Sequence, residues 1–162
     1  MHDTSIDLLN QAMADELAAI HQYMYFHFRL DDLGYNPLAN LLKQTAIEEM
    51  QHAERIAERI LFLGGEVEMQ VARTIEKIHD AAEMLAKAKA LEEESIAMYN
   101  RFAVACAEHA DSGSKKLFED LVGFEEVHYD QFDRQEDFVK RFGERYLALQ
   151  SFEPGGEAAP AP

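Results

Sequence analysis

Hydrophobic positions recur every three or four residues through most of this chain, which is the spacing of one face of an α-helix. The alternation of apolar and polar residues that marks a half-buried strand is hard to find, and proline is nearly absent before residue 153. The pattern therefore predicts an all-α protein.

Breaks in this pattern divide the chain into four long helices and a short fifth one. Gly34 and Pro37 separate the first two helices, Gly64-Gly65 ends the second, and Asp111-Ser112-Gly113 joins the third to the fourth. Gly143 ends the fourth helix. We expect the helices at about residues 3–33, 38–64, 80–110, 114–142 and 144–150.

The connection between the second and third helices, residues 66–79, is unusually long. It spans about 46 Å if extended, whereas an antiparallel turn between helices needs only a few residues. We therefore expect a crossover along the bundle that makes these two helices parallel. Residues 1–152 then form one four-helix bundle with its fifth helix, and residues 153–162, rich in Pro, Gly and Ala, form a disordered tail.

Composition narrows the function classes. The chain has 162 residues, 48% of them hydrophobic, which suits one domain with a substantial core. The single Cys106 excludes a disulfide framework or thiolate cluster, so a metal site must use oxygen and nitrogen ligands. A net charge of -16 argues against nucleic-acid binding. Without a secretory signal near Met1 or an apolar run long enough to span a bilayer, we expect a cytoplasmic protein without membrane contact.

A repeated arrangement of Glu and His is the main candidate for chemistry. Each half of the chain has a Glu, 32 intervening residues, and then a Glu-x-x-His unit. A third such unit, Glu76 to His79, has Lys43 at the matching upstream position and no counterpart, so it is interpreted as a coincidence in a loop. The repeated set consists of Glu16, Glu49 and His52 in the first half and Glu92, Glu125 and His128 in the second.

All six side chains fall on the apolar stripes of the expected helices, facing the interior. Four buried carboxylates without cations would be costly, so a bound cation is the favoured explanation. The alternative is internal neutralisation by Lys or Arg, for which the stripes offer only Lys89. Such a donor set suits two iron ions, and Tyr23, Tyr99 and Tyr129 lie in helical register to hydrogen-bond it or simply to pack in the core.

The chain resembles a bacterioferritin over about residues 5–150. The matching segments are ELAAIHQY around Glu16, IEEMQHAERIAERILFLGG around Glu49, ALEEES around Glu92 and FEEVHYD around Glu125. The resemblance implies a ferritin-like four-helix bundle with an iron-storing ferroxidase centre. In it, Glu49 and Glu125 bridge the two irons of each subunit, and the pairs Glu16 with His52 and Glu92 with His128 are terminal ligands.

The same resemblance gives Met50 a second role. On the helix it lies about 100° away from Glu49, off the metal-facing stripe, where an apolar side chain would ordinarily be packing. In bacterioferritins the residue at this place binds haem iron, so the resemblance implies haem b or a related iron porphyrin, one per subunit dimer, held by two such Met. Candidates to line the haem pocket are Leu17, Ile20, His21 and Met24.

The family also sets expectations for assembly and partners. Its fifth helix accompanies a cage of 24 subunits built from two-fold dimers, and a bacterioferritin-associated ferredoxin is the implied electron donor. Some members carry His and Asp on the inner face, where this chain has Gln44 and Glu48. Whether the irons stay at the centre or pass inward is therefore open.

The resemblance implies that ferrous iron is oxidised with dioxygen or hydrogen peroxide and stored as ferric mineral. Three other functions are alternatives to this one. A rubrerythrin-like peroxidase would need an electron-transfer module, and the chain lacks paired CxxC units. A DNA-protecting mini-ferritin usually places its ligands between subunits, whereas both half-sites lie in this chain, and no basic tail is present. A helical interaction module without metal is the remaining alternative.

Overall fold

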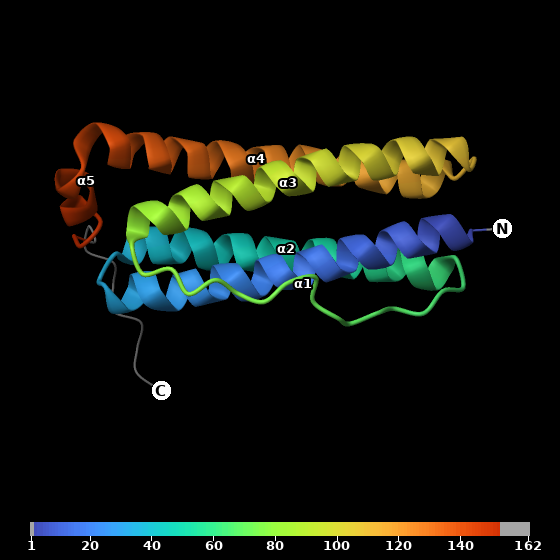
Figure 1. The fold of residues 1–162 in the computed structure, drawn as a ribbon, viewed down its shortest axis with the longest axis horizontal. Helices are drawn as coiled ribbons and strands as arrows, with labels where there is room; N and C mark the ends of the chain where they lie inside the picture. The colour runs from blue at the N-terminus through green and yellow to red at the C-terminus, as the bar shows by residue number, and fades with distance from the viewer. Residues whose placement is uncertain (1, 153–162) are drawn as a thin grey trace.

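The computed structural model describes residues 2–152, and regular structure in this range is helical throughout (Figure 1). The prediction of an all-α bundle with a short fifth helix is confirmed, whereas the expected disordered tail lies outside the described residues. None of the described helices is long and apolar enough to cross a membrane. The helices are α1 (Asp3–Asp32), α2 (Asn36–Phe62), α3 (Ala81–Glu108), α4 (Ser112–Phe142) and α5 (Glu144–Leu149).

The bundle consists of two antiparallel hairpins, α1 with α2 and α3 with α4 (Figure 1). The segment between α2 and α3 runs back along α1 for much of the bundle length, so α2 and α3 point the same way. The predicted crossover is therefore present. Short α5 turns across the end of the bundle where α4 finishes.

Side-chain amides of α1 hold the crossover in place. Asn10 donates a hydrogen bond to the carbonyl of Glu66 (3.0 Å) and accepts one from the N–H of Glu68 (2.9 Å). Gln22 makes the same pair of bonds to Glu76, at 3.0 and 2.7 Å. These contacts satisfy main-chain groups that lack partners in regular secondary structure. The extended segment is thereby fastened at two places along α1.

Two turns differ in detail from the expectation. Pro37 lies in the first turn of α2, where its missing N–H costs nothing, and is not part of the preceding stop. The turn before α4 uses Ala110, with φ of 57°, in place of Gly113, which is helical. Gly113 is nevertheless restricted, because a Cβ there would lie 2.6 Å from a guanidinium nitrogen of Arg59. Asp111 caps α4 by accepting a hydrogen bond from the N–H of Ser114.

The apolar core is split into two clusters along the bundle axis. On each of the four long helices, the candidate metal ligands lie in sequence between the residues of one cluster and those of the other. The centre of the bundle is therefore a polar layer closed above and below by apolar packing. The largest buried side chains are Tyr23, Phe26, Leu30, Leu38, Leu42 and Phe132 in one cluster and Leu9, Met13, Ile56, Ile60, Tyr99 and Phe118 in the other.

Candidate metal centre

The structure brings all six side chains of the repeated motif to one point in the polar layer. They form two groups, and within each group one ligand atom per residue lies within 4.8 Å of all the others. Glu49 and Glu125 belong to both groups. We call the group of Glu16, Glu49, His52 and Glu125 the His52 half-site, and the group of Glu49, Glu92, Glu125 and His128 the His128 half-site.

The ligand set is buried and lacks cationic side chains. Each of the six residues exposes 4% of its surface or less. Among the described residues, the ion-pair partners of the four carboxylates are the two imidazoles, with no Lys or Arg. Lys89, the candidate for internal neutralisation, instead pairs with Asp133 (3.1 Å) and Glu136. Buried carboxylates without such partners favour a bound cation.

Three buried atoms of the centre have no hydrogen-bond partner among the described residues: Nδ1 of His52, Oε2 of Glu49 and Oε1 of Glu125. They are nevertheless close together, with the His52 nitrogen 2.7 Å from the Glu49 oxygen and 3.2 Å from the Glu125 oxygen. Buried polar atoms are normally satisfied. These atoms lie close together without forming hydrogen bonds, as the ligand atoms of a metal ion between them would. The residues present therefore fit a metal, and carboxylate oxygen with imidazole nitrogen is a donor set that iron accepts.

Proximity changes the acidity of the carboxyl groups. Burial, reinforced by repulsion from Glu49, raises the pKa of Glu16 and of Glu92 well above the usual range. Burial also acts to raise the pKa of Glu49, but the neighbouring His128 and His52 imidazoles outweigh it and hold this pKa at about 2. Glu49 therefore stays ionised, whereas Glu16 and Glu92 retain their protons to a higher pH than usual.

The imidazoles are held in their charged form. Burial acts to lower the pKa of His52, but the adjacent Glu125 and Glu49 carboxylates raise it to about 9. The pKa of His128 is raised further by the same carboxylates together with Glu92. Without a metal, protons therefore provide the positive charge that a cation would supply.

Two of the three candidate tyrosines contact the centre. The Tyr23 hydroxyl donates to Glu92, and the Tyr99 hydroxyl donates to Glu16 at 2.5 Å. Both phenols are buried, and burial beside these carboxylates raises the pKa of each. Tyr129 is half-buried and makes no hydrogen bond to the six side chains within the described region, so of the two roles considered for the tyrosines, the contact with the centre is made by Tyr23 and Tyr99.

Two contacts at the edge of the centre were not anticipated from the sequence. Asp15 is buried beside Glu16, and it accepts hydrogen bonds from Arg73 of the crossover (2.5 Å) and from Ser95 (2.9 Å). Glu48 accepts a hydrogen bond from Nε2 of His128 (2.7 Å). Sequence spacing identified the stripe that faces inward, but it could not show which neighbouring carboxylates turn toward it.

Met50 lies outside the core, with 49% of its surface exposed, so core packing does not account for it. On α1, Leu17, Ile20 and Met24 are half-buried and His21 is exposed. These positions are accessible at the surface of one subunit. The Glu76-to-His79 unit lies in the crossover and contributes to neither half-site.

Comparison with known proteins places the chain in a family. A model of the ferritin-like domain matches residues 6–142. The bacterioferritin of Desulfovibrio desulfuricans is 39% identical over 144 residues, covering 88% of this chain and 80% of that protein, and the bacterioferritin of Rhodobacter capsulatus is 37% identical over 92% of each chain. An X-ray structure of the D. desulfuricans bacterioferritin, which describes its diiron site, superposes with a TM-score of 0.91 at 35% identity over 97% of this chain and 92% of that one. This chain belongs to the bacterioferritin family.

Proposed function

We propose that the protein stores and detoxifies iron, and that the centre is a ferroxidase whose substrate is ferrous iron. One observation carries the proposal: six buried ligands form two half-sites that share two carboxylates, with no Lys or Arg among the described residues to neutralise them. In this assignment Glu49 and Glu125 bridge two ions. Glu16 with His52, and Glu92 with His128, complete the separate half-sites.

The bound iron supplies one electron per ion, so a pair of ferrous ions matches the two-electron reduction of hydrogen peroxide or the first two-electron step of dioxygen reduction. The protein prepares the site for both oxidation states. Its carboxylates are hard ligands that stabilise the ferric product. The Tyr99 and Tyr23 hydroxyls orient Glu16 and Glu92 by hydrogen bonds, and the apolar clusters on either side restrict water. Ferric product then collects as mineral inside a protein shell.

Met50 is the proposed haem ligand. Its thioether is exposed on α2, as a ligand shared by two subunits across a two-fold axis must be, and thioether sulfur suits haem iron. The bound group would be haem b or a related iron porphyrin, and its role would be to assist reductive release of stored iron. A bacterioferritin-associated ferredoxin is the proposed electron donor in the cytoplasm.

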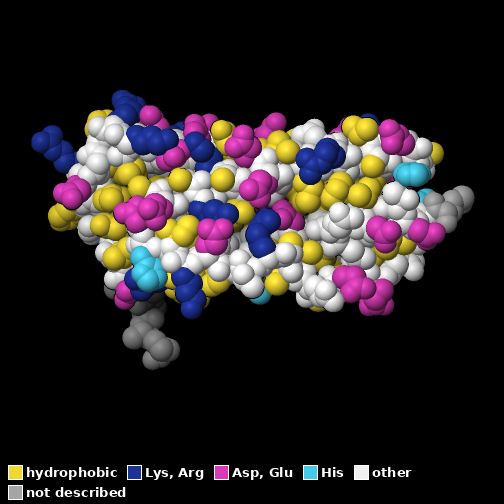
Figure 2. Space-filling model, in the orientation of Figure 1, with side chains coloured by type: hydrophobic (Ala, Val, Ile, Leu, Met, Phe, Trp, Pro, Cys, Tyr) yellow, Lys and Arg dark blue, Asp and Glu magenta, His cyan; other side chains and the backbone are white. Residues whose placement is uncertain are grey.

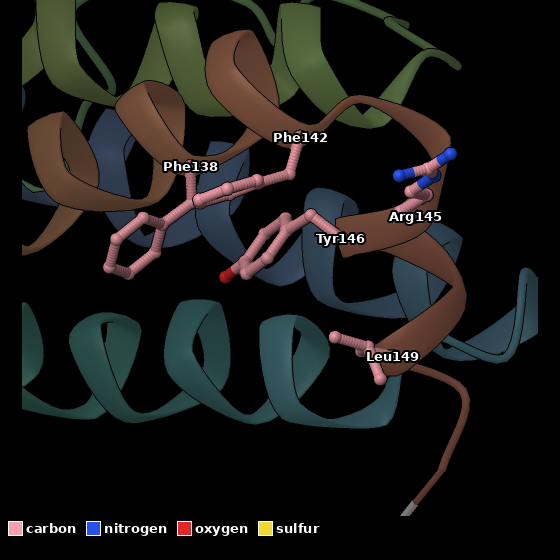
Figure 3. Close-up of a pocket in the computed structure, with 5 residues that line it drawn as sticks. All are labelled: Phe138, Phe142, Arg145, Tyr146 and Leu149. Carbon is pink, nitrogen blue, oxygen red and sulfur yellow. The ribbon is translucent and has the colours of Figure 1, made fainter.

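Exposed apolar surface favours contact between subunits, and the assembly proposed from the family is a shell of 24. Hydrophobic side chains gather in patches between charged ones on the face shown in Figure 2. At the end of the bundle, Phe138, Phe142, Tyr146 and Leu149 line an open apolar pocket between α4 and α5, with Arg145 at its rim (Figure 3). Phe142 is 50% exposed and Leu149 is 65% exposed, which favours contact with other subunits.

The test combines assembly with kinetics. Metal-free protein is loaded anaerobically with about two ferrous ions per subunit, sized by chromatography with light scattering, and mixed with dioxygen or peroxide in a stopped-flow instrument. We expect a particle of about 24 subunits and rapid oxidation at the centre. Glu125→Gln should abolish the rapid phase, whereas Glu126→Gln, at an exposed neighbouring position, should retain it. In Met50→Leu, the haem Soret band should be lost while rapid oxidation remains.

A small oligomer that oxidises iron but accumulates no mineral would refute storage and leave a rubrerythrin-like peroxidase. Absence of any rapid phase in the wild-type protein would refute the ferroxidase assignment itself.

A further inference from the structure

The two half-sites are related by the sequence repeat, and their matching residues are 76 positions apart. The relation holds for the ligands and also for the tyrosines, because Tyr23 contacts the ligand Glu92 as Tyr99 contacts Glu16. It breaks down behind the two imidazoles, where Glu48 of one half corresponds to Phe124 of the other.

The two residues hold their imidazoles by different forces. Glu48 accepts a hydrogen bond from Nε2 of His128 at 2.7 Å. Phe124, the residue at the matching place on α4, packs against the His52 ring, with the two ring centres 5.2 Å apart and the ring planes at 35°. Every contact of His52 with a described carboxylate within ion-pair distance is made by Nδ1, the atom that faces the centre. One imidazole therefore has an anionic hydrogen-bond partner in addition to the six candidate ligands, and the other packs against an aromatic ring.

Two further charged residues border the His52 side, but each is paired. Asp15 accepts from Arg73 at 2.5 Å. Arg55 lies over the Phe124 ring, 5.3 Å from its centre, and also pairs with Asp120 at 3.2 Å. Each of these charges thus has a partner of opposite sign, whereas Glu48 is the carboxylate outside the ligand set that contacts an imidazole of the centre.

An outer carboxylate affects how well an imidazole binds metal. By accepting the Nε2 proton, it keeps that proton away from Nδ1 and makes Nδ1 a stronger donor, and loss of such a partner typically lowers metal affinity about 10- to 100-fold. Phe124 restrains the His52 ring by packing but accepts no such strong hydrogen bond. The two half-sites should therefore differ even though their inner ligands match.

We propose that the His128 half-site binds its ion tightly and that the His52 half-site is the exchanging one, with Glu48 and Phe124 as the positioning residues that set the difference. This inference rests on the proposed metal-binding function. It answers in part whether the centre retains its iron: one ion stays as a resident and the other is the ion that passes through.

Cobalt(II) tests the inference without redox chemistry. Metal-free protein receives about one Co²⁺ per subunit, and the occupancy of each half-site is measured in crystals by anomalous diffraction. We expect cobalt at the His128 half-site in at least about tenfold excess over the His52 half-site. Glu48→Gln should reduce this ratio about 10-fold or more. Phe124→Glu, which installs a carboxylate at the matching place, should raise His52 occupancy toward parity, whereas Phe124→Leu adds no anion and should leave the preference in place.

Equal filling of the two half-sites in the wild-type protein would overturn the inference and leave the proposed function intact. The same holds if Glu48→Gln leaves the occupancy ratio unchanged. Absence of cobalt from both half-sites in wild-type crystals would overturn the proposed metal centre together with the inference. Calorimetric titration in solution provides the second readout, since only the tighter of two binding steps should weaken in Glu48→Gln.

Discussion

Metal loading of this centre should release protons in a number that the structure sets. At neutral pH the raised pKa values of His52, about 9, and of His128 keep both imidazoles protonated in the metal-free protein. Each must lose a proton before Nδ1 can bind an ion. The raised pKa values of Glu16 and Glu92 add up to one proton each. We therefore expect about two to four protons released per subunit when two divalent ions bind.

The upper value follows from charge balance. Two divalent ions neutralise the four ligand carboxylates, and four protons distributed over the same ligands do so without metal. Release should be largest in mildly acidic solution, where Glu16 and Glu92 contribute most. It should fall as the pH rises through about 9, where His52 has already lost its proton in the metal-free state.

The assay is calorimetric titration of metal-free protein with Zn²⁺ in buffers of different ionisation enthalpy at a fixed pH, which gives the number of protons transferred per ion. Glu93→Gln is the matched control, because this residue adjoins Glu92 in sequence but is exposed, so its substitution should not change the number. Release of fewer than about two protons per subunit at neutral pH would refute the reasoning, since it would mean that the imidazoles are already neutral.

Three further predictions concern stability. In the metal-free protein, the raised pKa of His52 contributes about 3 kcal/mol to the free energy of unfolding. This contribution is fully present below pH 6.5 and is lost as the pH rises through about 9. Calorimetry should therefore show a falling Tm over this window, and an unchanged Tm would contradict the prediction. Tyr99→Phe leaves an oxygen of Glu16 without its donor, so the metal-free protein should lose about 1–3 kcal/mol in thermal unfolding, whereas Tyr129→Phe should lose little. Ala110 adopts a left-handed backbone conformation, which is strained for a residue with a Cβ. Ala110→Gly should relieve this strain, stabilise the protein by about 1 kcal/mol and raise its Tm. A lower Tm would show that the turn is unstrained.

The helical pattern and the repeat were sufficient to predict the bundle, the crossover and which side chains converge. The reason is that a helix has a fixed period: once Glu16 and Glu49 share faces with apolar residues, packing of those faces must bring them together. The Gly residues also marked helix ends, since a left-handed conformation at Gly34 and Gly64 is easily adopted by glycine.

Other features depend on which partner a side chain contacts, and the helical period of the sequence does not predict this. Glu48 lies next to the ligand Glu49, off its stripe, and only the three-dimensional structure shows its carboxylate turned to His128. The hydrogen bonds from Asn10 and Gln22 to the crossover could not be predicted from the sequence either, because a single amide on a helix is compatible with many partners. The sequence predicts the turn at Asp111-Ser112-Gly113, a few residues too late, because glycine is the usual choice for a positive φ and here Ala110 adopts it.

The polar layer between the two apolar clusters has a consequence for how the four long helices align. Sliding one helix by a turn would place a Glu or His of that layer among Leu and Phe side chains and would put an apolar residue among the carboxylates. An all-apolar bundle tolerates such shifts far better, since its alternative alignments bury similar surface. The buried Glu and His side chains therefore specify how the four helices align along the bundle axis. A single buried polar residue specifies the alignment of a coiled coil in the same way.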